Sequence, residues 1–261
     1  MSTYLFEHAW DQERRRLALL EEVFDAATEE YLGRIPIPVG GTCLEVGAGA
    51  GSVAGWLCDR VGPSGRVVAT DLDTGFLEQR PEPNLEVRRH NIVTDDLETG
   101  TYDVIHSRLV LEHIAERDEV LRRLVAALRP GGWLVQEDFD WCSLASPPGC
   151  RSGALAIQAL EAFRGIFEAA GADPEYGRCL PLDFRAAGLV DVGAEGRVHV
   201  ALGGTAAAAW WQVTLVKMCE PLLANGSLSE AEVAGVLAAC DDPDFCMVSP
   251  TLVTAWGRRP E

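Results

Sequence analysis

Positive charge is scarce in this sequence: 22 lysine and arginine residues stand against 40 aspartate and glutamate residues, giving a formal net charge of −18. Such a field repels phosphate backbones, so no nucleic-acid partner is expected. Apolar residues make up 48% and charged residues 24% of the 261 residues, which excludes a largely disordered chain. The length fits one large domain, or a core with a modest cap.

Metal-binding and export signatures are also missing. None of the eight cysteines forms a CxxC pair, the motif typical of zinc ribbons and thioredoxins. Neither class of protein is therefore indicated, and no metal site is expected. Cys43 and Cys58 lie in apolar runs and are predicted to be small core residues. Residues 1–20 are charged and lack the apolar stretch of a signal peptide, which together with reduced thiols favours the cytoplasm.

The longest uncharged run, residues 200–216, is not expected to cross a membrane. Glycine, threonine and glutamine interrupt it, whereas a span needs about 20 mostly apolar residues. A buried helix is the better interpretation.

Spacing of the apolar residues predicts the organisation of the chain. Residues 5–32 show a helical apolar period that ends at the proline- and glycine-rich run 35–41, so residues 1–38 are expected to form a helical lid segment. Short apolar runs then alternate with helical stretches, which predicts a doubly wound, mostly parallel α/β sheet over residues 39–261.

Seven strands and several helices are expected in that second part. The strands are predicted at 42–46, 66–70, 85–89, 102–107, 133–137, 189–195 and 246–256, and the first helices at 51–61 and 116–128. Later helical stretches at 157–170 and 205–239 predict helical cap insertions near 141–188 and 203–243.

The most informative stretch runs from Leu44 to Gly51, where a predicted strand enters a loop with glycines at 47, 49 and 51. Glycine allows a sharp turn and close approach of a ligand to the backbone. Asp71 ends the next strand, 20 residues past Gly51, where a carboxylate can bind both hydroxyls of a ribose. Residues 49–54 also satisfy the G-x-G-x-x-G/A dinucleotide pattern, so the loop alone leaves the ligand open.

Four motifs taken in order resemble those of class I S-adenosylmethionine-dependent methyltransferases. They are Glu45-x-Gly-x-Gly-x-Gly51, the acid Asp71, the run 102–107 (YDVIHS) and the run 128–133 (LRPGGW). The resemblance is closer still to the small-molecule methyltransferases common in actinobacteria; it covers about 40–200 and extends to the N-terminal run 4–16. It implies a Rossmann-like methyltransferase fold, S-adenosylmethionine as cofactor, and methyl transfer to O, N or C of a small metabolite.

The same resemblance assigns roles to individual residues. Glu45 would hold the loop and the cofactor ammonium, Asp71 the ribose diol, and Leu72 the adenine face. Asn91 stands where the family usually has an acid, and its amide oxygen can still accept from the adenine amino group. The complete expected cofactor-binding set is Glu45, Gly47, Ala48, Gly49, Gly51, Asp71, Leu72, Asn91, Ile92, Ser107 and Arg108.

Catalytic candidates follow the fourth and fifth strands. His113 is the natural base near neutral pH, with a packed or solvent-facing helix histidine as the alternative. Glu137 and Asp138 end the fifth strand and could accept a proton or orient an acceptor. Tyr4 and His8 could close over the cofactor as a lid. A bulky, largely apolar acceptor is expected if these residues line the site: Trp141, Trp210, Trp211, Met218 and Phe245.

Two other functions remain open from the sequence. A protein of this fold could bind the cofactor yet act as a cyclase or binding protein, because methyl transfer needs no fixed catalytic residue. An NAD-dependent oxidoreductase is the second alternative, although no Ser/Tyr-x-x-x-Lys set is recognisable. The expected partner is a small-molecule substrate, with no membrane, and the chain is expected to be a monomer or homodimer.

Overall fold

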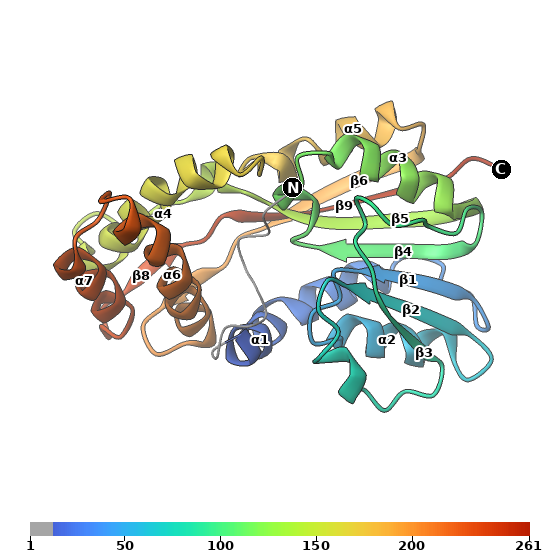
Figure 1. The fold of residues 1–261 in the computed structure, drawn as a ribbon, viewed down its shortest axis with the longest axis horizontal. Coiled ribbons are helices and arrows are strands. Elements are labelled where there is room, and N and C mark those ends of the chain that lie inside the picture. The colour runs from blue at the N-terminus through green and yellow to red at the C-terminus, as the bar shows by residue number, and fades with distance from the viewer. Residues whose placement is uncertain (1–12) are drawn as a thin grey trace.

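The computed structural model describes residues 13–261 and is built on one seven-stranded sheet with strand order β3-β2-β1-β4-β5-β9-β6 (Figure 1). Five strands run parallel: β1 (Thr42–Val46), β2 (Arg66–Asp71), β3 (Leu85–Arg89), β4 (Tyr102–Arg108) and β5 (Leu128–Asp140). The last strand, β9 (Thr251–Arg258), is antiparallel to both β5 and β6 (Val190–Arg197). The predicted doubly wound, mostly parallel seven-stranded sheet is confirmed.

Neighbouring residues of each central strand feed two separate cores, because successive side chains of a strand point to opposite faces. Cys43 and Val104 face the core that contains α2 (Ser52–Val61) and the end of α1 (Glu13–Leu32). Leu44 and Ile105 face the opposite core. That second core contains α3 (Arg117–Ala127) and α5 (Leu180–Ala186), which lie above the sheet in Figure 1.

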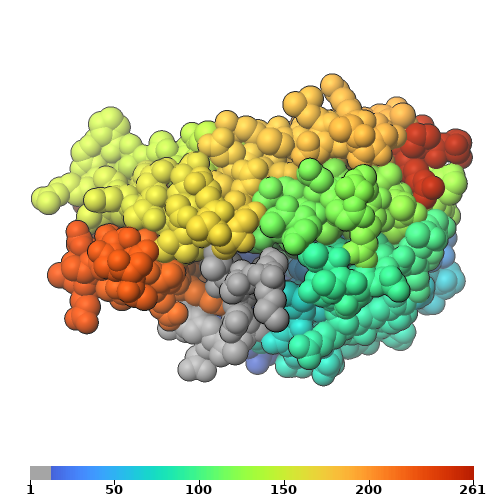
Figure 2. All heavy atoms as spheres, turned by 45° about the horizontal axis from the view of Figure 1, so that its top comes forward, coloured from blue at the N-terminus to red at the C-terminus, as the bar shows by residue number. Residues whose placement is uncertain are grey.

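A cap extends from the end of the sheet where β5 and β9 project farthest. It consists of α4 (Arg151–Ala169), α6 (Ala206–Ala224), α7 (Glu230–Cys240) and a two-stranded sheet of β7 (Val200–Leu202) and β8 (Cys246–Val248). In the space-filling view its residues (yellow and orange) occupy one end of the molecule, and residues 70–130 (cyan to green) the other (Figure 2). Four short 3₁₀ turns complete the elements: η1 (Leu77–Gln79), η2 (Leu111–His113), η3 (Trp141–Ser143) and η4 (Tyr176–Arg178).

Three expectations about the late elements need correction. The helical block expected at 205–239 is two helices, because the chain turns at Gly226 and Ser229 starts α7 with a capping box. The single strand expected at 246–256 is split into β8 and β9 before Thr251, since Pro250 has no N–H for a sheet. Within the expected insertion 141–188, α5 covers the main sheet instead of the cap.

The helix α1 joins the cap to the sheet. Phe24 is buried in the cap core, with its ring 5.9 Å from that of Phe139 and 5.2 Å from that of Trp210, both near edge-on. Leu32, at the other end of α1, is buried in the sheet core. The helix therefore spans both parts; the expected lid residues Tyr4 and His8 lie outside the described residues.

Residues 13–261 contain neither a membrane-spanning helix nor a disulfide bond. No helix within 13–261 is long and apolar enough to cross a membrane. All eight cysteines lie in this range and all are free, with Cys43 and Cys58 buried as expected.

Shortening Phe24 tests how much stability the contact between α1 and the cap provides. Phe24→Ala is expected to lower the free energy of unfolding by about 3–5 kcal/mol, because it removes a buried ring and leaves a cavity. Urea denaturation measures the change. Glu29→Ala, on the exposed side of the same helix, is the control and should stay within about 0.5 kcal/mol of the wild type. A Phe24→Ala protein as stable as this control would contradict the packing described for α1.

Candidate active site

A large cavity opens at the carboxyl ends of β1, β2 and β4 and continues beneath α1 into the cap. The empty space within it is about 1510 Å³, including the open mouth. The sheet end is polar and carries the glycine loop, while the cap end is lined by aromatic side chains. Two ligands of different character can thus lie end to end.

The glycine loop adopts a conformation that only glycine tolerates well. Gly47 has φ 67° and Gly49 has φ 57°, in the left-handed region. A Cβ at Gly47 would overlap the side chain of Val110, which lines the cavity from the other side. The Gly49 N–H donates to Oδ2 of Asp71 at 2.9 Å. This hydrogen bond holds the glycine loop against the end of β2.

The residues expected around an adenosine group surround this part of the cavity. Leu72 lines it and is 43% exposed, an apolar surface open to a planar ligand. Asn91 and Ile92 also line it. The side-chain oxygen of Asn91 accepts from the Val93 N–H at 2.9 Å, which orients the amide and leaves one lone pair of that oxygen for a ligand.

Beneath the loop, an imidazole is buried between two carboxylates. Nδ1 of His106 lies 2.9 and 2.8 Å from the carboxylate oxygens of Glu45, and its Nε2 lies 3.3 Å from Oε2 of Glu137. Burial alone lowers the pKa of His106, but the two carboxylates outweigh it and raise the pKa to about 9. The imidazole is therefore protonated at neutral pH and donates to both carboxylates.

Glu137 does not face the cavity, contrary to the expectation for a catalytic residue. Its side chain points to the same side of the sheet as His106 and accepts from the hydroxyls of Thr28 (2.5 Å) and Thr254 (2.6 Å). Burial opposes its ionisation, yet the hydrogen bond from His106 keeps the pKa of Glu137 below its ordinary value. Glu137 is an ionised structural carboxylate with its oxygens already in use.

Arg108 lines the cavity but is tied to α1. Its guanidinium donates to the Thr28 hydroxyl and to Oδ1 of Asp25, both at 2.9 Å. Ser107 does not line the cavity and is buried between the strands. Only one of the two residues expected at the methionyl end therefore reaches it.

Asp138 also points away from the cavity, to the opposite face from Glu137 because the two are neighbours on a strand. Its Oδ1 accepts from the amides of Val110 and Glu112 at 3.2 Å each. Burial raises the pKa of Asp138 to about 7. Asp138 thus holds the turn η2 in place, and η2 carries His113.

The chain enters η2 through a strained residue. Leu109 has φ 56°, uncommon for a side chain other than glycine, asparagine or aspartate, and it lines the cavity. Its amide donates to the Glu137 carbonyl at 2.7 Å, which locks the strained backbone onto β5. Such strain persists only where the surroundings determine it, and it is frequent at functional sites.

His113 lines the cavity between the glycine loop and the aromatic end. Its ring packs edge-on to Phe167 at 5.1 Å, and its Nε2 lies 3.5 Å from a carboxylate oxygen of Glu112. Burial, assisted by the positive charge of Arg16, lowers the pKa of His113 to about 3. Burial raises the pKa of Glu112 well above its ordinary value. His113 is therefore uncharged at neutral pH.

The cap end of the cavity contains four of the five aromatic-pocket candidates: Trp141, Trp210, Trp211 and Met218. The fifth, Phe245, is buried in the cap core away from the cavity. The sequence interpretation missed further lining residues contributed by α1, β5, α4 and α6, namely Arg16, Leu17, Leu20, Glu21, Phe139, Phe167 and Thr214. The cap end of the cavity is thus a chamber formed by α1 and the cap together.

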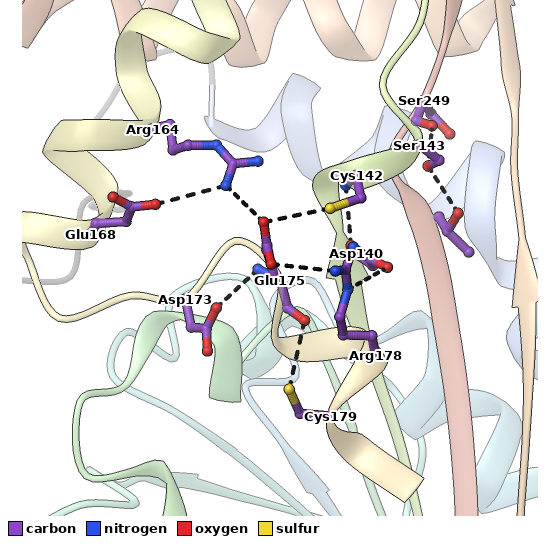
Figure 3. A network of polar contacts seen from close by, with 11 residues as sticks. Asp140, Cys142, Ser143, Arg164, Glu168, Asp173, Glu175, Arg178, Cys179 and Ser249 are labelled. Atoms are coloured by element: carbon purple, nitrogen blue, oxygen red, sulfur yellow. Dashed lines mark hydrogen bonds and ion pairs between the residues drawn. The ribbon is translucent and has the colours of Figure 1, made fainter.

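Asp140, at the end of β5, belongs to a polar network on the outside of the cap junction (Figure 3). Arg178 donates to both of its oxygens, at 3.0 and 2.7 Å. Glu175 accepts from Arg164 of α4 at 3.1 Å and from the Cys142 thiol at 3.4 Å. These contacts join β5, α4 and η4, so Asp140 holds the cap against the sheet.

The sheet topology and the glycine-loop cavity together are those of a Rossmann-like methyltransferase fold. Residues 44–134 match the family model described as "Methyltransferase domain". The resemblance inferred from the four motifs is confirmed.

Individual proteins that are similar to this chain are also named as methyltransferases. Methyltransferase str2 of Strobilurus tenacellus is 35% identical over 146 residues, which is 52% of this chain and 49% of that protein. The 27-O-demethylrifamycin SV methyltransferase of Amycolatopsis mediterranei is 25% identical over 189 residues, 64% of this chain and 65% of that protein. The chain thus spans about half of the first relative.

Solved structures share the fold at low identity. Phosphoethanolamine N-methyltransferase 2 of Haemonchus contortus, solved with S-adenosylhomocysteine, superposes with a TM-score of 0.55. It is 15% identical, and the match covers 95% of this chain and 53% of that one. This likeness concerns the fold alone.

The buried imidazolium predicts a loss of stability at alkaline pH. The pKa of His106 rises on folding from its ordinary 6.5 to about 9, so its contribution is fully present below pH 6.5 and lost as the pH rises through 9. We expect the free energy of unfolding to fall by about 3 kcal/mol over this range. Urea denaturation at several pH values measures it. His106→Gln should flatten the dependence, whereas His90→Asn, which changes a histidine remote from both carboxylates, should retain it. An unchanged slope in His106→Gln would show that another group titrates.

Proposed function

We propose that this protein transfers the methyl group of S-adenosylmethionine to a bulky, largely apolar small molecule. The observation that carries the proposal is the two-ended cavity, with a glycine loop and Asp71 at one end and an aromatic chamber at the other. His113 lies where the two ends meet.

The polar end suits a cofactor with positive charge and a ribose. Glu21, Glu45 and Asp71 line the cavity against two arginines, Arg16 and Arg108. Burial and the nearby charge of Asp25 raise the pKa of Glu21. An ammonium beside Glu45 and a ribose diol at Asp71 would complete these contacts, and the pyrophosphate of NAD would meet carboxylates. This charge distribution supports S-adenosylmethionine over the dinucleotide alternative.

The aromatic end suits an uncharged, extended acceptor. Trp141, Trp210 and Phe167 present apolar faces, and Met218 supplies a flexible side chain that adapts to irregular shapes. The net charge of −18 speaks against nucleic acid, and the unpaired cysteines fit a cytoplasmic location. Monomer and homodimer are both compatible with this site, which one chain completes.

The chain's residues position the acceptor and exclude water. Glu45 and Asp71 would hold the cofactor, which would supply an electrophilic methyl carbon on a sulfonium; its thioether would leave as the acceptor–carbon bond forms. The O–H or N–H of the methyl-accepting substrate donates a hydrogen bond to neutral His113. This orients a lone pair of the substrate oxygen or nitrogen toward the methyl group. Because the pKa of about 3 makes His113 a weak base, its first role is orientation, and it takes the proton only as the new bond forms.

Cofactor choice is tested by calorimetry with S-adenosylhomocysteine and NAD. We expect binding of the first and none of the second at micromolar concentrations. Asp71→Ala should weaken S-adenosylhomocysteine binding by about 1.5–3 kcal/mol, since it removes the ribose acceptor and the partner of the Gly49 amide. Asp73→Ala is the matched control, and its backbone N–H still donates to Asp71. Micromolar NAD binding without a response to S-adenosylhomocysteine would overturn the proposal.

The role of His113 is tested with His113→Phe, which keeps a ring against Phe167 and removes the nitrogens. With an acceptor found by screening phenols, carboxylic acids and amines with methyl-labelled cofactor, turnover should fall about 10²-fold or more. Affinity for S-adenosylhomocysteine should stay within about two-fold, because positioning of the acceptor supplies the effect. In the wild type, no inflection of turnover near pH 6.5 is expected, since His113 is neutral throughout.

His199→Phe, which changes a histidine outside the cavity, is the control for the loss of an imidazole. Wild-type turnover in His113→Phe would remove His113 from the mechanism. Conversion of a substrate without consumption of the bound cofactor would favour the cyclase alternative. Cofactor binding with no conversion of any acceptor would favour the binding-protein alternative.

A further inference from the structure

A continuous path of buried polar contacts leads from the cavity to the part of α1 that lies outside it. It runs Glu45–His106–Glu137–Thr28–Arg108–Asp25. Building on the proposed function, we propose that His106 is a positioning residue that couples docking of α1 to binding of the cofactor ammonium at Glu45.

The middle of the path lies outside the cavity. Glu45 and Arg108 line the cavity, whereas His106, Glu137 and Thr28 do not and are fully buried. Glu45 and His106 are register partners on β1 and β4, which places their side chains on the same face of the sheet. A change at Glu45 therefore reaches Thr28 through side chains that have no alternative contact with water.

Each joint of the path fixes the next group in one orientation. With both imidazole nitrogens protonated, His106 can point one N–H at Glu45 and the other at Glu137. The Thr28 hydroxyl has a single hydrogen, which it gives to Glu137, so its lone pairs are free to accept from Arg108. Thr28 thus connects a carboxylate of β5 to a guanidinium of β4 from a position on α1.

Formal charge along the path is not balanced within the chain. Glu45, Glu137 and Asp25 contribute three negative charges, and His106 and Arg108 contribute two positive ones. An ammonium beside Glu45 would offset this charge locally. A cation at Glu45 therefore stabilises the arrangement that includes docked α1. By linkage, docked α1 must strengthen cation binding by the same factor.

The coupling has a consequence for the order of binding. The first half of α1 supplies Arg16, Leu17 and Leu20 to the wall of the acceptor chamber. A cofactor that stabilises docked α1 therefore completes the chamber before the acceptor enters. We expect binding of an apolar acceptor to depend on prior occupation of the cofactor end.

Thr28→Val tests the path without touching the cavity. Valine keeps the shape of threonine and removes the hydroxyl that joins Glu137 to Arg108. Affinity for S-adenosylhomocysteine, measured by calorimetry, should fall about 2- to 30-fold, the range of energetic coupling between separated sites. Thr28→Ser retains the hydroxyl and should restore the affinity.

Glu30→Gln is the matched control on the same helix. Glu30 binds Arg197 of β6 at the surface and takes no part in the path, so its loss should leave the affinity unchanged. Equal losses in Thr28→Val and Glu30→Gln would overturn the path in favour of general docking of α1. Wild-type affinity in a folded Thr28→Val protein would overturn it outright, while the proposed function would stand.

Hydrogen exchange of the wild type provides a measurement that needs no variant. S-adenosylhomocysteine should slow exchange in residues 24–32 of α1, which do not line the cavity, in addition to the glycine loop. Protection confined to the loop and residues 16–21 would overturn the coupling. A wild type that does not bind S-adenosylhomocysteine at all would overturn the proposed function and the path with it.

Discussion

The imidazolium of His106, buried between the carboxylates of Glu45 and Glu137, is the constraint around which the sheet end of this molecule is arranged. Three adjacent strands each contribute one member, so none of the three can shift register without leaving a buried charge unpaired. Breaking a buried ion pair by removing one partner costs far more than its net contribution to stability. The cluster therefore specifies the register of β1, β4 and β5 beneath the glycine loop more than it adds to stability.

The same cluster separates two roles that acidic residues play in the structure. Glu45 accepts from His106 and also lines the cavity. Glu137 and Asp138 accept hydrogen bonds from groups inside the protein and do not line the cavity. His113 differs from His106 because burial, assisted by the charge of Arg16, lowers its pKa, whereas two carboxylates raise the pKa of His106. Two histidines of one chain thus have pKa values about six units apart.

Much of the sheet could be predicted from the sequence because its strands are short, apolar and separated by glycine turns. Gly47, Gly49, Asp71 and Leu72 line the cavity, and their assignment to a cofactor stays a prediction. Glu137 and Asp138 were misplaced because proximity to a strand end does not say which face a side chain takes. The role of His106 depends on its register with Glu45 and on Glu137 from another strand, which periodicity cannot supply. The signal in the sequence for His106 is that a titratable side chain stands within the apolar strand β4.

The hydrophobic cores are divided in a way that bears on how such a protein can diversify. Within residues 13–261, the cap core includes Trp210, Trp211 and Met218 but no buried residue of β1 to β4. Substitutions in separate cores combine additively when they share no partners. The chamber at the cap end can therefore accumulate substitutions that change its shape while the sheet end keeps its stability. Gene copies of such a protein can diverge in the shape of this chamber without a compensating change in the sheet.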